Sequence, residues 1–266
     1  MRLPDCAPLR NFWSALAAAP RAALFLDYDG TLAPFHIDPA QARPYPGVEA
    51  LLNRIGRLPG DRLVIVSGRW LQDLRPLLAL DFEPEMWGCH GRERRLPDGR
   101  YSLAPLSEAA VRALAEADGW VATVGAAGGR VERKPGSLAF HWRGLAPGHQ
   151  RALRRDLEAR FAGLAQAGEL AWHAFDGGIE LRAADCDKGQ VVRQVLAEPG
   201  AGQQDCVAYL GDDHTDEDAF RALAGRGLRV LVRPKWRPTE ADVWLRPPDG
   251  LREFLVCWAQ IREHIR

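Results

Sequence analysis

The sequence predicts an α/β protein: a parallel, Rossmann-like sheet that carries an inserted α+β domain. Short apolar runs alternate with segments of helical spacing near both ends of the chain, as in proteins built from βα units. Between residues 101 and 182 this alternation gives way to the order helix, strands, long helix, strands. We therefore expect residues 1–100 and 183–266 to form the core, with residues 101–182 as a separate cap domain.

The composition is that of a globular protein without a strongly charged or membrane partner. The 266 residues are 47% hydrophobic, and 35 basic side chains balance 35 acidic ones. This balance gives no general attraction to nucleic acid or anionic lipid, and no apolar run approaches the ~20 residues of a membrane span. The five cysteines form no Cys-x-x-Cys pair, which favours a reducing compartment. We expect a cytoplasmic monomer that binds neither nucleic acid nor membranes.

The first strand is predicted at residues 24–26, after a short amphipathic helix at residues 12–19. Its apolar run ends at Asp27 and Asp29, followed by Gly30, which allows the loop to turn sharply. Open parallel sheets bind their ligands at the carboxyl ends of the strands, so both acids are candidate functional residues. The alternative is an ordinary Asx turn, which uses the same residue types.

The second strand is predicted at residues 62–66 and is followed by Ser67, Gly68 and Arg69. A helix at residues 48–58 joins the two strands, so they lie parallel and their carboxyl ends share one edge. Ser67 is therefore expected at the same edge as Asp27, where its hydroxyl can donate to a phosphoryl oxygen. Ser-Gly alone is also common in ordinary loops.

A third strand at residues 86–88 precedes the predicted insert. Within the insert we expect helices and strands at residues 107–117, 131–142, 147–167, 170–175 and 179–182. Glu132 and Lys134 lie two apart in one of these strands, so their side chains point to the same face. Residues in such positions often only face solvent. A neutral sugar needs hydrogen-bond donors and acceptors, however, and this pair supplies both.

The core resumes with Lys188 before a helix, then a strand at residues 206–210. The loop after that strand holds five acids between Asp212 and Asp218. Acids this close repel one another, so a divalent cation is a natural partner, with Asp212 and Asp216 as its ligands. The alternatives are a solvated lysine and acids that complement the dipole of the following helix.

Taken in order, these four segments resemble the motifs of the haloacid dehalogenase superfamily. The resemblance implies that Asp27 attacks phosphorus to give an aspartyl-phosphate and that Asp29 moves the proton. It implies that Ser67 and Lys188 hold the phosphoryl oxygens. It also implies a Mg²⁺ ion whose ligands are Asp27, Asp29, Asp212 and Asp216, with Asp29 binding through its backbone carbonyl.

Segments of the insert narrow the resemblance to the trehalose-6-phosphate phosphatases. The similar segments are Gly88–Glu93, Glu132–Pro135, His141–Arg143, Glu180–Arg182 and Gly211–Phe220. The resemblance implies hydrolysis of trehalose 6-phosphate to trehalose and phosphate, with Glu132, Lys134 and Glu180 bound to sugar hydroxyls. The further substrate-binding residues that it implies are Gly68, Arg69, His90, Gly91 and Arg143.

Two alternatives remain open at the level of sequence. The same chemistry on another sugar phosphate, such as a glycosylglycerol phosphate or a hexose phosphate, uses the same catalytic groups. A phosphatase-like domain that has lost its activity and serves as a sensor or partner module has the same fold. The acids that the chemistry needs are all present, which favours an enzyme.

Overall fold

The computed structural model describes residues 3–165, 168–175, 177–198 and 206–264. These residues form two compact units. The core unit comprises the chain up to Ser102 and from Asp187 onward, and the insert unit comprises Leu103–Cys186. The sequence predicts the insert at residues 101–182, so the structure shifts its bounds by two and four residues. The α/β fold with an inserted α+β unit is confirmed.

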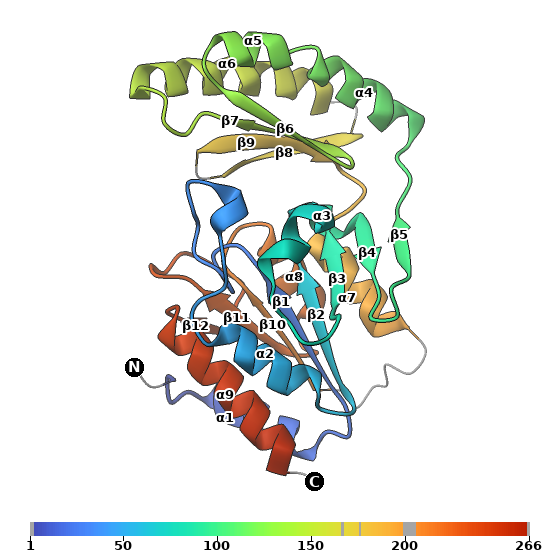
Figure 1. Cartoon of the computed structure of the whole chain (residues 1–266), viewed down its shortest axis with the longest axis vertical. Helices are drawn as coiled ribbons and strands as arrows, with labels where there is room; N and C mark the ends of the chain where they lie inside the picture. The colour runs from blue at the N-terminus through green and yellow to red at the C-terminus, as the bar shows by residue number, and fades with distance from the viewer. Residues whose placement is uncertain (1–2, 166–167, 176, 199–205, 265–266) are drawn as a thin grey trace. The chain divides into compact units, whose positions relative to one another are not determined.

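The core unit is built on an eight-stranded sheet (Figure 1). Its strand order is β12-β11-β10-β1-β2-β3-β4-β5, and the six strands from β12 to β3 are parallel. Strand β4 runs antiparallel to β3. The strands are β1 Ala22–Asp27, β2 Asp61–Val66, β3 Glu85–Gly88, β4 Glu93–Arg95, β5 Tyr101–Leu103, β10 Cys206–Gly211, β11 Leu228–Val232 and β12 Val243–Leu245.

Helices cover both faces of this sheet because the inner strands are apolar on both sides. In β1, Leu24 and Leu26 pack against helices α1 Ala7–Ala18, α2 Val48–Gly56 and α9 Asp249–His264. Ala23 and Phe25 pack on the opposite face against α7 Lys188–Ala197 and α8 Asp216–Leu223. The shorter helical segments are η1 Pro39–Gln41, α3 Leu71–Leu74, η2 Arg75–Leu77 and η3 Cys89–Gly91.

The insert unit is a four-stranded antiparallel sheet with helices on one face (Figure 1). Its strand order is β6-β7-β9-β8, and the strands are β6 Arg130–Lys134, β7 Ser137–His141, β8 Leu170–Phe175 and β9 Gly178–Ala183. Helices α4 Glu108–Asp118, α5 Val121–Ala126 and α6 Pro147–Ala165 lie on the apolar face, where Phe140 and Phe161 are fully buried. The predicted end of the last helix, at residue 167, lies outside the described residues.

The other face of the insert sheet carries polar side chains. Strand register places Glu132 beside Ala139, Ala139 beside Glu180, and Glu180 beside His173, so these four residues form one row across the sheet. Because alternate residues of a strand point to the same face, Lys134 lies on this face with Glu132. The insert thus has an apolar side that holds it together and a polar side available for recognition.

Candidate active site

The loop after β1 brings two acids to the carboxyl edge of the core sheet. Asp27 is the last residue of β1 and is 3% exposed. The loop closes through a hydrogen bond from the Gly30 N–H to the Ala33 carbonyl, 2.8 Å long. Gly30 has φ +82°, and a Cβ atom there would lie 2.2 Å from a carboxylate oxygen of Asp212. Only glycine therefore allows the loops after β1 and β10 to approach each other this closely.

Lys188 connects the loop after β1 to the loop after β10. It is the first residue of α7, and its ammonium donates to Asp27 at 2.6 Å and to Asp216 at 2.7 Å. Burial by itself lowers the pKa of Lys188, but the two carboxylates outweigh it and raise that pKa above its ordinary value. The lysine is therefore charged and held between the acids, and the solvated-lysine alternative is wrong for this chain.

Asp216 organises the loop after β10. One of its oxygens accepts the backbone N–H groups of Asp212 and Asp213, both at 3.0 Å. Its other oxygen accepts from Lys188 and from the hydroxyl of Tyr209, at 2.7 Å each. Four donors thus converge on this fully buried carboxylate, which fixes the turn that carries Asp212.

The residues at this edge match the needs of a divalent cation. Atoms of Asp27, Asp212 and Asp216 lie within 4.8 Å of one another, and Lys188 is the ammonium that pairs with two of these carboxylates. The Oδ2 atom of Asp27 is buried and makes no hydrogen bond. A hard cation with oxygen ligands satisfies that atom and offsets the excess negative charge.

The electrostatics of the isolated protein point the same way. Burial raises the pKa of Asp27 to about 8, an effect that Lys188 only partly offsets and that Asp216 and Asp29 reinforce. Burial, together with the charges of Asp27 and Asp216, raises the pKa of Asp212 well above its ordinary value. Without a cation, therefore, these acids resist full ionisation.

The geometry distinguishes Asp212 from Asp216 within the predicted ligand set. Both oxygens of Asp216 already accept hydrogen bonds, whereas the carboxylate of Asp212 faces Gly30 in the loop after β1. Asp212 is therefore the better direct ligand, and Asp216 is better suited to hold Asp212 and Lys188 in place. The role of each acid toward a cation stays a prediction.

Ser67 and its neighbours lie at the same edge. Register pairs Asp27 with Val66, so Ser67 follows at the end of the adjacent strand. The Ser67 hydroxyl accepts the N–H of Arg69 at 3.1 Å, and the Ser67 carbonyl accepts the N–H of His90 at 3.0 Å. His90 is buried, and a Cβ atom on Gly68 would lie 2.6 Å from its imidazole. The structure thus brings these predicted residues together.

Arg69 and Gly91 have structural contacts that the sequence did not indicate. The guanidinium of Arg69 donates to both oxygens of Asp29, at 2.6 and 2.7 Å, and to the carbonyl of Pro39 at 2.8 Å. Gly91 packs so closely on α7 that a Cβ atom would lie 2.7 Å from Val191. Their predicted contacts with substrate remain predictions, and Arg69 is in addition the partner that orients Asp29.

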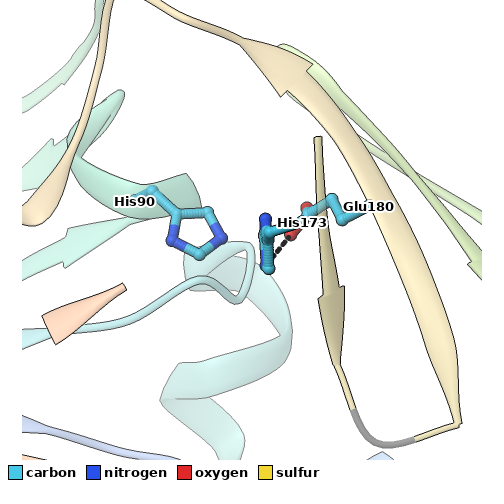
Figure 2. A group of neighbouring side chains, drawn as sticks. All are labelled: His90, His173 and Glu180. Carbon is cyan, nitrogen blue, oxygen red and sulfur yellow. Dashed lines mark ion pairs between the residues drawn. The ribbon is translucent and has the colours of Figure 1, made fainter. Parts of the chain in front are cut away.

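The predicted residues of the insert form one network on its polar face. Lys134 donates to Glu180 at 3.2 Å, and the Ser137 hydroxyl donates to the same carboxylate at 2.6 Å. Figure 2 shows His173 facing Glu180, with Nε2 and Oε2 3.6 Å apart. His141 lies 3.0 Å from Glu132 through its Nε2. Glu132, Lys134 and Glu180 are therefore held by neighbours before any ligand binds.

Arg143 lies in the loop after β7, two residues beyond His141. A Cβ atom on Gly177 would lie 2.8 Å from its Nε, so the arginine lies across the turn between β8 and β9. Its predicted role in substrate binding is not decided by this contact.

Comparison with known proteins identifies the family. The model of the trehalose-phosphatase family matches residues 25–243. A probable trehalose-phosphate phosphatase of Sinorhizobium fredii is 33% identical over 94% of this chain and 92% of its own length. The chain belongs to the trehalose-phosphatase family. Another relative, the trehalose-phosphate phosphatase of Mycobacterium avium, is 36% identical over 95% of this chain. The chain spans only 60% to 66% of the length of the trehalose-phosphate phosphatases of Mycobacterium marinum, M. avium and M. ulcerans.

Solved structures of this family share the fold. The C-terminal domain of a Candida albicans trehalose-6-phosphate phosphatase matches with a TM-score of 0.78 at 22% identity, over 98% of each chain. A Bacteroides thetaiotaomicron phosphatase of the haloacid dehalogenase superfamily matches with a TM-score of 0.63 at 16% identity, over 90% of this chain and 95% of its own. The fold predicted from the strand-end motifs is therefore confirmed.

Sequence reasoning missed several residues that support the site. Tyr209 looks like a core residue of β10, yet its hydroxyl donates to Asp216, and burial raises its pKa well above the ordinary value. Its position two residues before the end of a strand that leads into the acidic loop was the available signal. Arg237 also contacts this loop, through the carbonyl of Asp213 at 2.7 Å, from a segment without any periodic pattern.

Among the described residues, none of the helices combines the length and the apolar character needed to cross a membrane.

Proposed function

We propose that this protein is a Mg²⁺-dependent phosphatase that hydrolyses trehalose 6-phosphate to trehalose and phosphate. The observation that carries the proposal is Asp27, a buried carboxylate with one oxygen on Lys188 and the other without a hydrogen bond. A structural ion pair has no need for an unsatisfied buried oxygen, whereas a nucleophile that also contacts a cation does. Family membership supplies the substrate class.

The proposed reaction uses two acids in successive steps. An oxygen of Asp27 attacks phosphorus, the bond between phosphorus and the sugar oxygen breaks, and Asp29 gives its proton to that oxygen. Asp29 then takes a proton from water, which attacks the aspartyl-phosphate and releases phosphate with the Asp27 carboxylate restored. Arg69 donates to both oxygens of Asp29, which orients the ionised carboxylate that takes the proton from water.

Ser67 and Lys188 contribute hydrogen bonds to the phosphoryl oxygens in this scheme. Mg²⁺ would be held by Asp27, Asp212 and the backbone carbonyl of Asp29, and when bound it neutralises charge on the phosphate. Lys188 and Asp216 connect the loop after β1 to the loop after β10, since Lys188 bonds Asp27 and Asp216, and Asp216 bonds the backbone of Asp212. In this scheme the nucleophile, the proton carrier and the cation site come from the ends of β1 and β10, with Ser67 after β2 and Lys188 at the start of α7.

The polar face of the insert is proposed to bind the sugar. Glu132 and Lys134 on β6 and Glu180 on β9 present acceptors and donors on either side of β7, and each is already oriented by a neighbour. The pKa of Glu132 is below its ordinary value: burial would raise it, but hydrogen bonding to His141 and the charge of Lys134 outweigh burial. An ionised carboxylate at this position accepts hydroxyl hydrogen bonds well.

The test is phosphate release from a panel of sugar phosphates in the presence of Mg²⁺. Trehalose 6-phosphate is expected to have the highest kcat/KM, above glucose 6-phosphate and a glycosylglycerol phosphate. Asp27→Asn is expected to abolish turnover while the thermal melting temperature is kept, since the amide preserves shape and removes a charge that burial disfavours. If another sugar phosphate has the highest kcat/KM, the assignment of trehalose 6-phosphate as the substrate is wrong. Turnover by Asp27→Asn would contradict the mechanism.

A further inference from the structure

The turn formed by Asp212 and Asp213 is held from two sides. On one side, Asp216 accepts both backbone N–H groups of the turn. On the other side, the guanidinium of Arg237 donates to both backbone carbonyls, to that of Asp212 at 3.3 Å and to that of Asp213 at 2.7 Å. Arg233 also donates to the Asp212 carbonyl, at 3.2 Å, so Arg237 is the residue that joins the two carbonyls. The backbone N–H and carbonyl groups of both Asp212 and Asp213 are therefore hydrogen-bonded to charged side chains.

Arg237 is itself anchored. It is 9% exposed, and its Nη1 atom donates to Glu217 at 2.5 Å and to the Pro238 carbonyl at 2.8 Å. Glu217 also accepts from the hydroxyl of Thr239 and from the N–H of Glu240, both at 2.8 Å. The loop between β11 and β12 is thereby tied to the first turn of α8 and to the cation-binding turn.

The arrangement adds hydrogen bonds without adding net charge. Because the Arg237 guanidinium is paired with the Glu217 carboxylate, it does not act mainly as a counter-charge to Asp27 and Asp212. Its planar fork is instead matched to two carbonyls that point in fixed directions. Without the fork, the Asp212 carbonyl keeps only its bond from Arg233, and the Asp213 carbonyl loses its guanidinium donor. Since the direction of the Asp212 side chain follows from its backbone, the carboxylate of this candidate cation ligand is then held less firmly.

We propose that Arg237 is a positioning residue that sets the divalent-cation affinity of the site by fixing the Asp212–Asp213 turn. The proposal rests on the Mg²⁺ site of the proposed function. Residues outside the ligand shell that orient ligands typically change metal affinity 10–100-fold when they are replaced.

The experiment measures Mg²⁺ binding directly by calorimetry on the purified full chain, next to the melting temperature in EDTA. Arg237→Met is expected to raise the Mg²⁺ Kd about 10-fold or more, and Arg237→Lys to give an intermediate Kd because one donor can reach a carbonyl but two cannot. The matched control is Arg229→Met. Arg229 lies in β11 and makes an ion pair with Asp242 through two hydrogen bonds, at 3.0 and 2.6 Å. Its loss should lower stability but leave the Mg²⁺ Kd within about twofold of that of the parent protein.

Equal Mg²⁺ affinity in the parent and Arg237→Met proteins would overturn the inference, and so would equal weakening by Arg237→Met and Arg229→Met. If Arg237→Met does not fold, Arg237→Lys decides, since a Kd equal to that of the parent would again contradict a role for the fork. A parent protein that binds no Mg²⁺ at all would instead refute the cation site of the proposed function.

Discussion

At the scale of single residues, the site depends on close approaches that only particular side chains permit. Gly30 allows the carboxylate of Asp212 to lie against the loop after β1. Both carboxylate oxygens of Asp216 already accept hydrogen bonds from its neighbours. Asp27 and Asp212 are therefore the two acids best placed to bind a cation directly, since Asp27 has an oxygen without a hydrogen bond and an oxygen of each lies within 4.8 Å of the other. Small changes at these positions should therefore act on cation binding more than on folding.

Gly30→Ala is expected to abolish cation binding and activity. The new methyl group would lie 2.2 Å from an oxygen of Asp212, so one of the two loops must move. The control is Gly47→Ala, because Gly47 has a similar φ of +86° but no atom within 4 Å of the added Cβ. Both variants should lose roughly 1–2 kcal/mol of stability from the strained backbone. Calorimetry with Mg²⁺ should separate them, and an unchanged Kd in Gly30→Ala would contradict the proposed ligand role of Asp212.

Removal of the cation is expected to stop turnover. Enzyme treated with EDTA and then freed of chelator should regain activity with Mg²⁺ but not with Zn²⁺, because the candidate ligands are carboxylate and carbonyl oxygens that suit a hard octahedral ion. Phosphate release measured against added cation concentration checks this. Full activity in excess chelator would exclude the Mg²⁺-dependent mechanism.

At the scale of elements, one buried arginine joins three parts of the core unit. Arg262 of α9 donates to Asp61 at the start of β2 at 2.8 Å and to the carbonyl of Ala19 after α1 at 2.6 Å. Trp258 donates to the same aspartate at 3.0 Å. The last helix is thus fastened to the sheet and to the first helix by a paired charge as well as by apolar packing.

Arg262→Met is expected to lower the free energy of unfolding by about 3–5 kcal/mol, because it leaves the carboxylate of Asp61 buried without its cation. Arg252→Met in the same helix is the control. Arg252 pairs with Asp249 at a side-chain exposure of 43%, so its loss should change stability by less than about 1 kcal/mol. Urea denaturation of both variants measures the difference. Similar midpoints for the two would show that the buried pair adds little.

At the scale of the whole molecule, the two units have separate chemical roles in the proposed function. The core carries the groups that act on phosphorus, and the insert carries an array of hydrogen-bonding groups on one sheet face. Binding energy from a part of the substrate that does not react can still raise the rate at the part that does. Substrate choice and catalysis should therefore respond to different substitutions.

Glu132→Ala is expected to lower kcat/KM for trehalose 6-phosphate by roughly 10–100-fold, the loss on the order of 1–3 kcal/mol that follows when a polar group is left unpaired. Hydrolysis of a small aryl phosphate, which lacks the sugar hydroxyls, should hardly change. The control is Arg133→Ala, since Arg133 lies on the opposite face of β6 and pairs with Asp118 at 2.7 Å. Equal losses on both substrates in Glu132→Ala would mean that Glu132 supports structure or catalysis and not sugar recognition.

The sequence predicts where residues that follow a strand lie. It does not predict contacts between residues that are far apart in the sequence. Asp27 and Ser67 follow predicted strands directly and Asp212 follows one after a single glycine, so their common edge follows from parallel topology. The bond from Lys134 to Glu180 needs the register of β6, β7 and β9, which alternation alone does not fix. Arg237 reaches the acidic turn from an irregular loop, where no periodic pattern reports the direction of a side chain.

The position of β1 between β2 and β10 also has a consequence for synthesis on the ribosome. Ala22 of β1 pairs with Cys206 of β10, and the whole insert lies between them in the sequence. At ~5–20 residues per second, the ~140 residues that separate β2 from β10 take roughly 7–28 s to emerge. During that interval the central strand has one open edge, which is a template for pairing with other chains. The strands of the antiparallel insert are closer in sequence, so we expect the insert to form its sheet without waiting for β10.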